Sequence, residues 1–389
     1  MAFSKRSNSQ KTMQLASIFL VVLFIASNIH AANNPTFIFH TDLLDIGLPI
    51  FDISLKPSEH DVALDKYLSH PMMQIAFTRY SSLSRPPESR VDRKLYSDFI
   101  HKLWADNENQ IAHPRMQYIL PHYKWGMMHL TTVKADSELV KKQFRIWFNT
   151  AVEQLPWQGN FIRASTDPIH IVFLFDPGGS FPWVTESSGV EYIFVDVLQL
   201  RGPGDTNRES PPDIDITTGL LVHELFHIVQ NDSNKPNNAG QWLIQSAVAE
   251  GAACLYGNNV PDSRGQKILP KKPIRFPQAI TDEWLREILS APAQIKPFLT
   301  LASEWSKKQP KDEEKLEMLT KGKWVATPGN KLYIGNIYRV GAEMLLKIKG
   351  ELGEKAFADI LSHSNKLPEY WSKLEDMHKQ VKSSPVAAP

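Results

Sequence analysis

Residues 223–227 read His-Glu-Leu-Phe-His, a combination of types and spacing that can do metal chemistry. Two histidines four positions apart lie on one face of a helix, so their imidazoles can converge on a single tetrahedral cation such as zinc. Glu224 lies beside them, where its carboxylate can reach a metal-bound water rather than the metal itself. We therefore take His223 and His227 as candidate metal ligands and Glu224 as a candidate general base.

The same residues also fit a simpler interpretation. His223, Glu224, His227, Gln230 and Asn231 follow helical spacing, and together they could form the polar stripe of an ordinary amphipathic helix. The pentad alone leaves both interpretations open, because short motifs recur by chance.

Glu250 favours the metal interpretation. It lies in the stretch Gln245–Ala253, among small and apolar residues, where an ionised carboxylate is costly unless it is paired or coordinates a metal. A zinc ion held with the two histidines would be such a partner. The small residues 251–253 would let the helix that carries Glu250 approach the His223 helix closely. The alternative is a surface glutamate on a partly exposed helix.

The chain resembles the gluzincin class of zinc metallopeptidases in two elements, the pentad at 223–227 and the Glu-Gly-Ala-Ala sequence at 250–253. The stretch Trp242–Ala253 is similar to uncharacterised bacterial zinc-dependent peptidases. The stretch Tyr338–Leu361 is similar to a Tyr-x-x-Gly helix and a glycine-centred turn found downstream in such proteins. The resemblance covers residues from about Ile169 to Leu361.

A gluzincin resemblance implies a zinc site with His223, His227 and Glu250 as ligands, and a water that Glu224 deprotonates for attack on a peptide carbonyl. It also implies a zincin-like α+β fold, in which a small mixed sheet packs against the metal-binding helices, with mainly helical regions before and after. Tyr338 is a candidate for stabilising the oxyanion, although a tyrosine on an apolar helix is more often a core residue.

One further expectation follows from the resemblance, and one departure from a related pattern is plain. A strand edge usually holds the substrate backbone in such enzymes, and we expect Glu191–Leu200 to supply that edge. The metzincin continuation, with a third histidine soon after the pentad, is absent, since Gln230 and Ser233 stand there.

The alternative function is a non-catalytic zinc-binding or protein-interaction module on the same fold. The intact Glu224 argues against it, because a protein that only holds zinc has no use for a base at that position.

Other arrangements of reactive residues are weaker. The sequence has no Gly-x-Ser-x-Gly elbow for serine chemistry. Cys254, the only cysteine, fits a small buried apolar residue better than a nucleophile. Four further histidines lack ligand spacing and are expected to be ordinary surface or core residues: His101, His113, His122 and His129.

The type of secondary structure predicted for the elements that must position these residues changes along the chain. Apolar residues at helical spacing predict helices between Asp61 and Trp104, interrupted at Ser84–Arg90, and a further helix over Ser137–Leu155. Residues rich in β-branched and aromatic side chains predict two neighbouring strands, at Ile169–Phe175 and Glu191–Leu200.

The predicted metal-binding helix follows a polar loop at Arg201–Asp215, and Thr217 or Thr218 is its expected N-cap. A loop over Asp232–Gly240 separates that helix from a second one at Gln241–Tyr256.

The rest of the chain completes the predicted domain organisation. The lysine- and glutamate-rich segment Ala302–Lys323 is expected to be a solvated surface excursion, and Tyr338–Leu361 predicts two helices joined near Gly353. The chain thus divides into a mainly helical region at 33–160 and a zincin-like metallopeptidase region at 161–389.

Residues 1–32 have the order of a secretory signal peptide. A basic leader is followed by an apolar run over Leu15–Ile25 and by small residues at Ala31 and Ala32. An uncleaved membrane anchor is the alternative, but the run is shorter than the roughly 20 apolar residues that a spanning helix needs. We expect a secreted or periplasmic protein.

Composition sets a few further limits. A chain of 389 residues, 42% of them hydrophobic, can bury a sizeable core. The formal net charge of +1 gives no reason to expect nucleic acid or an anionic membrane as a partner. No later apolar stretch is long enough to cross a membrane, and a single cysteine cannot form an intramolecular disulfide. The expected partner is a peptide or protein substrate, and the oligomeric state is not indicated.

Overall fold

The computed structural model describes residues 36–82, 90–153, 161–163, 167–180, 182–201, 214–268, 278–308 and 335–383, with isolated positions between these ranges. The predicted signal peptide at 1–32, most of the loop at 201–215 and most of residues 309–334 lie outside the described residues.

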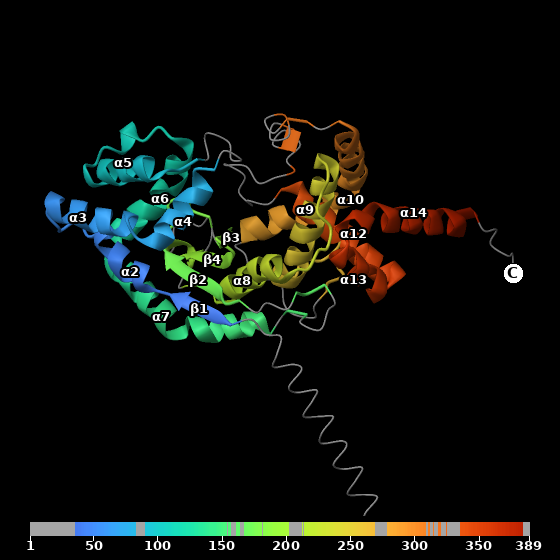
Figure 1. Cartoon of the computed structure of the whole chain (residues 1–389), viewed down its shortest axis with the longest axis horizontal. Coiled ribbons are helices and arrows are strands. Elements are labelled where there is room, and N and C mark those ends of the chain that lie inside the picture. The colour runs from blue at the N-terminus through green and yellow to red at the C-terminus, as the bar shows by residue number, and fades with distance from the viewer. Residues whose placement is uncertain are drawn as a thin grey trace, which may run out of the picture.

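Helices make up most of the N-terminal part of the chain, as the apolar spacing predicts (Figure 1): α2 (Asp42–Gly47), α3 (Pro57–Leu68), α4 (Pro71–Tyr80), α5 (Arg93–Trp104), α6 (Pro114–Met128) and α7 (Leu130–Val152). A proline stands in the first turn of α3, α4 and α6, where its missing N–H costs no hydrogen bond. Asp92 caps α5 by accepting a hydrogen bond from the Leu95 amide at 2.7 Å. The helix predicted from Ser137 begins earlier, at Leu130.

One small mixed sheet accompanies these helices, and the α+β class is confirmed. Its strands are β1 (Phe37–His40), β2 (Ile169–Leu174), β3 (Trp183–Ser187) and β4 (Val190–Asp196), in the order β1-β2-β4-β3. β2 pairs in parallel with both β1 and β4, and β3 pairs antiparallel with β4. The two predicted strands are therefore neighbours, but β1 and β3 were not predicted.

The expectation that Glu191–Leu200 supplies a sheet edge is wrong. β4 lies between β2 and β3, and residues 197–199 after it form a short 3-10 turn. In the described part of the chain, β1 and β3 are the edge strands. β3 was not predicted from the sequence because the strand is short. It joins β4 through a tight turn at Ser188 and Gly189, both of which have positive φ.

Aromatic side chains join the N-terminal helices to the sheet. Phe148 of α7 meets Phe37 of β1, and Phe144 of α7 meets Phe173 of β2, each pair at 4.3 Å between ring centroids. The Tyr67 hydroxyl of α3 donates to the Phe175 carbonyl at 2.8 Å, beyond the end of β2. The buried hydrophobic residues form one cluster that includes both halves of the chain.

The C-terminal helices gather on the opposite side of the sheet from α3 and α5 (Figure 1): α8 (Ile214–Val229), α9 (Ala239–Ala253), α10 (Gln278–Lys307), α12 (Asn336–Leu352), α13 (Glu354–Ser362) and α14 (Leu367–Ser383). The break between α12 and α13 falls at Gly353, as predicted, and its φ of +87° suits glycine. None of the described helices is long and apolar enough to span a membrane.

Two local predictions in this part are wrong. α8 already begins at Ile214, so Thr217 and Thr218 lie inside the helix, where both are buried, and neither is its N-cap. α10 continues to Lys307 and buries Trp305, so the first residues of the expected surface excursion belong to a packed helix. Burial of an apolar face that includes Trp305 stabilises this part of the helix despite the lysines around it.

Candidate metal centre

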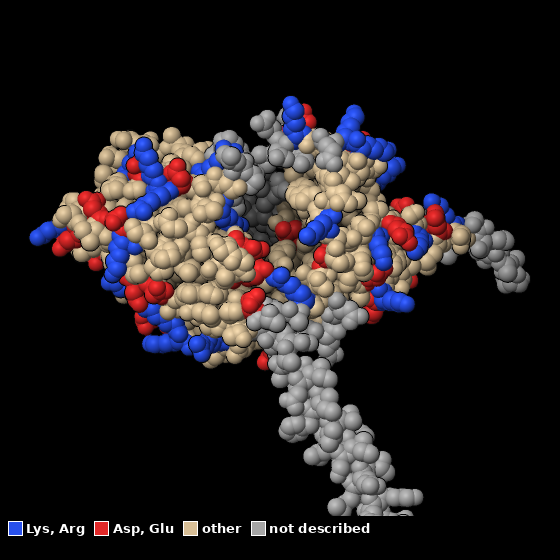
Figure 2. Space-filling model, viewed as in Figure 1, with Lys and Arg blue, Asp and Glu red and all other residues tan. Residues whose placement is uncertain are grey.

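The two candidate histidines lie on α8, which packs against β3, β4 and α7. α9 follows after a short loop and returns beside α8, which brings Glu250 back to the histidines. Asn238 caps α9 by accepting a hydrogen bond from the Gln241 amide at 2.9 Å, so the helix begins at Ala239, earlier than the predicted Gln241. The space-filling view is hollowed between the N-terminal helices and the C-terminal ones, with acidic atoms visible inside (Figure 2).

Three potential ligand atoms form a nearly equilateral triangle. The Nε2 atoms of His223 and His227 are 3.1 Å apart, and Glu250 Oε2 is 3.3 Å from the first and 3.2 Å from the second. A tetrahedral zinc ion with ligand distances of about 2.0–2.1 Å separates its ligand atoms by about 3.3 Å. The triangle therefore has the size that one zinc ion requires, and it is the only His/Cys/Asp/Glu group of this kind in the described part of the chain.

The positions of the polar atoms in this triangle suit a shared cation better than hydrogen bonds among the three side chains. Glu250 Oε2 is buried and has no hydrogen bond of acceptable geometry, although both imidazoles stand near it. Lone pairs that converge at such distances repel unless a proton or a cation lies between them. The residues present thus fit a metal ion held by two imidazole nitrogens and one carboxylate oxygen.

Charge coupling between the three side chains is strong. Burial alone would raise the pKa of Glu250, but His227 and His223 beside it hold that pKa well below its usual range. Burial alone would lower the pKa of His227, but the Glu250 carboxylate raises it to about 9. A carboxylate that is ionised at neutral pH and points at two imidazoles is suited to a divalent cation.

Glu224 is placed next to the triangle but does not belong to it. Burial raises the pKa of its carboxyl, and the charges of His223 and His227 oppose that rise. Arg79 of α4 also lowers the pKa of Glu224, so this guanidinium lies within electrostatic reach of the site. Glu250 therefore belongs to the group of candidate ligands, and Glu224 does not.

Two residues support the ligands from behind. Cys254 is buried, and its Sγ lies 3.9 Å from Nδ1 of His223, the ring nitrogen that faces away from the triangle. The Tyr338 ring of α12 stacks over His223, with 6.3 Å between ring centroids and 18° between ring planes. Burial raises the pKa of the Tyr338 hydroxyl, and the negative charge of Glu250 raises it further. Tyr338 thus stacks on one candidate ligand and lies within electrostatic reach of a second, and Cys254 behaves as the buried residue that was predicted.

Close helix packing at the site comes from glycines, but not in the predicted arrangement. A Cβ at Gly251 would lie 2.5 Å from the Gly341 carbonyl carbon, so Gly251 lets α9 meet α12 rather than α8. α8 is instead met by Gly257, where a Cβ would lie 2.6 Å from the His223 amide nitrogen. Gly257 belongs to a π-helical turn, Cys254–Asn258, that continues α9.

The other histidines lie elsewhere, as expected. His101 pairs with Asp61 at 3.0 Å on the surface, and His113 caps α6 by accepting from the Arg115 amide at 3.2 Å.

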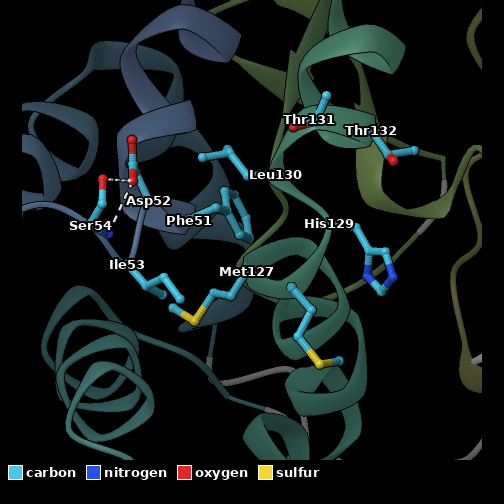
Figure 3. A pocket seen from close by; sticks show the side chains of 10 residues that line it. Phe51, Asp52, Ile53, Ser54, Met127, His129, Leu130, Thr131 and Thr132 are labelled. Carbon is cyan, nitrogen blue, oxygen red and sulfur yellow. Dashed lines mark hydrogen bonds between the residues drawn. The ribbon is translucent and has the colours of Figure 1, made fainter.

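A separate pocket of about 360 Å³ lies between the loop after Phe51 and the junction of α6 and α7 around His129 (Figure 3). Its lining contains none of the candidate ligands, so we do not connect it with the metal centre.

Sequence reasoning missed Arg79 as a neighbour of the site. The residue lies on α4, far from the pentad in the sequence, and no motif surrounds it. Only the packing of the N-terminal helices beside β3 brings its charge to Glu224.

Comparison with known proteins adds no relative to these observations. No protein-family model matches the chain, and neither a curated protein nor a solved structure matches it. The functional argument therefore depends on the residues and their geometry.

Proposed function

We propose that this protein is a zinc-dependent metallopeptidase of gluzincin type on a zincin-like fold, with His223, His227 and Glu250 as metal ligands. The observation that carries the proposal is the ligand triangle, with sides of 3.1–3.3 Å and a buried Glu250 oxygen that lacks a hydrogen bond. Two imidazoles and one carboxylate are a ligand set of known catalytic zinc sites, which keep a further position open to water or substrate. When bound, zinc would supply Lewis acidity and lower the pKa of a coordinated water.

In this proposal Glu224 moves the proton. Its carboxylate is next to His223 in sequence yet outside the ligand set, so it remains available to accept a proton from the attacking water. The same group then delivers the proton to the leaving amine. Burial raises the pKa of Glu224, which makes its carboxylate a stronger base.

Tyr338 has a supporting role at the same centre. Its ring stacks on His223 and its hydroxyl lies within electrostatic reach of Glu250, so it can orient ligands, which is the usual task of residues around a metal site. Stabilisation of the oxyanion by Tyr338 remains a prediction from the sequence. Export of the protein is likewise a proposal, because residues 1–32 lie outside the described part of the chain.

The decisive experiment compares three chains that differ at one carboxylate. Wild type, Glu224→Gln and Glu250→Gln are purified, loaded with zinc and measured for zinc stoichiometry and for cleavage of a mixed peptide library. We expect about one zinc per chain in wild type and in Glu224→Gln, with cleavage reduced by about 10²- to 10⁴-fold in that variant. Glu250→Gln should bind zinc more weakly, because it loses a charged ligand.

Two outcomes would contradict the proposal. Equal cleavage by wild type and Glu224→Gln would remove Glu224 from the mechanism. Stoichiometric zinc without any cleavage would favour the non-catalytic zinc-binding module.

A further inference from the structure

A hydrogen-bonded pair of polar side chains, Asp232 and Gln245, joins the chain just after α8 to α9. Asp232 stands five residues after His227, and Gln245 stands five residues before Glu250. The Gln245 Nε2 atom donates to Asp232 Oδ2 at 3.2 Å and to the Asn234 carbonyl at 3.0 Å. We call Asp232 and Gln245 the hairpin clamp, because they connect the two helices that carry the candidate ligands.

The Asp232 end of the hairpin clamp is itself fixed. Asp232 Oδ1 accepts hydrogen bonds from the Asn234 amide at 3.0 Å and from the Ser364 amide, just beyond α13, at 3.4 Å. The neighbouring Ser233 donates from its amide and its hydroxyl to the Ser362 carbonyl, at 3.0 and 2.9 Å. The connection between α8 and α9 is therefore bonded to the end of α13, and Asp232 is a fixed acceptor for Gln245.

Gln245 transmits this restraint to Glu250 through α9. Five residues of α-helix rise only about 7.5 Å, so a shift of Gln245 along the helix axis moves Glu250 by a similar amount. The candidate ligand atoms are 3.1–3.3 Å apart, and a metal centre requires its ligands to be held within about 0.5 Å. Gly251 sets how closely α9 approaches α12, whereas the hairpin clamp bonds α9 to the segment that follows α8.

We propose that Asp232 and Gln245 are positioning residues of the metal centre. They set the register of α9 against α8, and thereby the distance from the Glu250 carboxylate to the two imidazoles. The inference rests on the proposed function and concerns two residues outside the group of candidate ligands. Hydrogen bonds suit this task, because they weaken steeply when the donor and the acceptor move out of line.

The test changes the hydrogen bonds of the hairpin clamp while it keeps the size of the side chains. Gln245→Met has a similar length but no donor. Asp232→Asn keeps an acceptor for the backbone amides, but it can turn a donor toward the Gln245 amide group. The double variant Asp232→Asn with Gln245→Glu exchanges donor and acceptor, so that it restores the bond between the two side chains and keeps the net charge.

Gln241→Met is the matched control. Gln241 lies one turn before Gln245 on α9, and its Oε1 atom accepts a hydrogen bond from the Asn237 amide at 2.8 Å. That bond joins α9 to the adjoining loop and not to the residues that follow α8. The control therefore removes a comparable hydrogen bond of the same helix.

Chelator competition measures the zinc affinity of each chain, and Co²⁺ bound in place of zinc reports the ligand geometry through its visible absorption spectrum. We expect Gln245→Met and Asp232→Asn to lower zinc affinity by about 10-fold, within the range for residues that support metal ligands, and to alter the Co²⁺ spectrum. The double variant should recover part of the affinity, since its glutamate cannot donate to the Asn234 carbonyl.

Gln241→Met should lower the melting temperature of the metal-free chain about as much as Gln245→Met, with the zinc affinity and the Co²⁺ spectrum of wild type. Thermal melting identifies any loss of folding. Asp232→Asn keeps the comparison valid if Gln245→Met unfolds, because it leaves the acceptor of the Asn234 and Ser364 amides in place.

Three results would overturn the inference: wild-type zinc affinity in both single variants, an equal loss of affinity in Gln241→Met, or no recovery in the double variant. Absence of metal binding by wild type would overturn it together with the proposed function. Weaker zinc binding by the hairpin clamp variants, without peptide cleavage by wild type, would support the positioning role and contradict the peptidase. Cleavage by wild type with equal zinc affinity in all variants would do the reverse.

Discussion

At the residue scale, the three candidate ligands are not held alike. His223 is supported on its outer side by Cys254 Sγ at 3.9 Å and on its ring face by Tyr338. Glu250 keeps 26% of its side chain accessible, and its carboxylate interacts electrostatically with the Tyr338 hydroxyl. One tyrosine therefore acts on an imidazole through its ring and on the carboxylate through its hydroxyl.

The first prediction separates those two contributions. Tyr338→Phe keeps the ring that stacks on His223 but removes the hydroxyl that interacts electrostatically with Glu250. We expect zinc affinity to fall by about 10-fold, within the range for residues that orient metal ligands, with folding preserved. Competition with a chelator of known affinity measures the change.

The matched control is Tyr256→Phe. Tyr256 stacks on Phe226 of α8, the helix that carries His223, with 5.1 Å between ring centroids. In the described structure Tyr256 has no hydrogen bond with a candidate ligand. Zinc affinity that is identical in Tyr338→Phe and wild type would show that the hydroxyl does not orient Glu250.

At the scale of elements, the site depends on where α9 and α12 cross. A Cβ at Gly341 would lie 1.9 Å from the Ala247 carbonyl oxygen, so the two backbones touch at this point. Glu250 lies one turn of α9 beyond Ala247, and Tyr338 lies one turn of α12 before Gly341. Any separation of the helices at the crossing therefore moves a ligand and its support together.

We predict that Gly341→Ala destabilises the protein by about 3 kcal/mol, at the upper end of the cost of overpacking, and weakens zinc binding. The control is Gly350→Ala on the same helix, where the nearest atom is the flexible Gln266 Oε1 at 3.4 Å. That change should stabilise α12 by about 0.5–1 kcal/mol, since alanine is the better helix former. Denaturant unfolding measures both values, and equal effects of the two changes would contradict a backbone contact at the crossing.

A second prediction at this scale concerns β1 and β2. His40 Nε2 and His170 Nδ1 are 2.9 Å apart across these strands, and the rings stack with 5.0 Å between centroids. Burial lowers the pKa of His40 below 6.5, and the charge of His170 lowers it further, while burial lowers that of His170. The folded chain therefore binds fewer protons here than the unfolded chain, and its free energy of unfolding should decrease as the pH falls below about 6.5.

The pH dependence is checked by thermal melting of wild type and His170→Gln between pH 7.5 and 5. The variant lacks one titrating ring and also relieves His40 of its charge, so its melting temperature should fall less on acidification. Parallel curves for the two proteins would show that the histidine pair contributes nothing to the pH dependence.

Sequence patterns predicted local features of the site and missed those that tertiary packing decides. The His223 pentad and the apolar setting of Glu250 are visible within one helix each, and the structure brings the three predicted ligands together. The partner of Gly251 was wrong because a small residue indicates close approach but not which helix approaches. Arg79 was missed because its position depends on how α4 packs beside β3, which no local pattern encodes.

At the scale of the whole molecule, the two regions that the sequence distinguishes share one sheet. β1 belongs to the region at 33–160, yet it pairs in parallel with β2 of the region at 161–389, from Phe37 opposite Ile169 to His40 opposite Val172. The hollow in Figure 2 lies between helices from both regions, and α8, which carries His223 and His227, packs against α7 of the region at 33–160. The N-terminal region is therefore part of the body that forms the site.

This arrangement predicts that residues 161–389 do not fold alone. Without residues 33–160, β2 loses its parallel partner, Phe173 loses the Phe144 ring at 4.3 Å, and the Phe175 carbonyl loses the hydroxyls of Tyr67 and Tyr123 at 2.8 and 3.0 Å. Exposed apolar strand surface and unpaired buried backbone groups each cost free energy that a marginally stable protein does not have in excess.

We expect the fragment 161–389 to melt without cooperativity and to bind an apolar dye, whereas the chain 33–389 melts in a cooperative transition. Mixing the fragment with residues 33–160 during refolding should restore part of that transition. A fragment 161–389 that melts cooperatively and binds one zinc would show that the metal centre is built without the N-terminal helices.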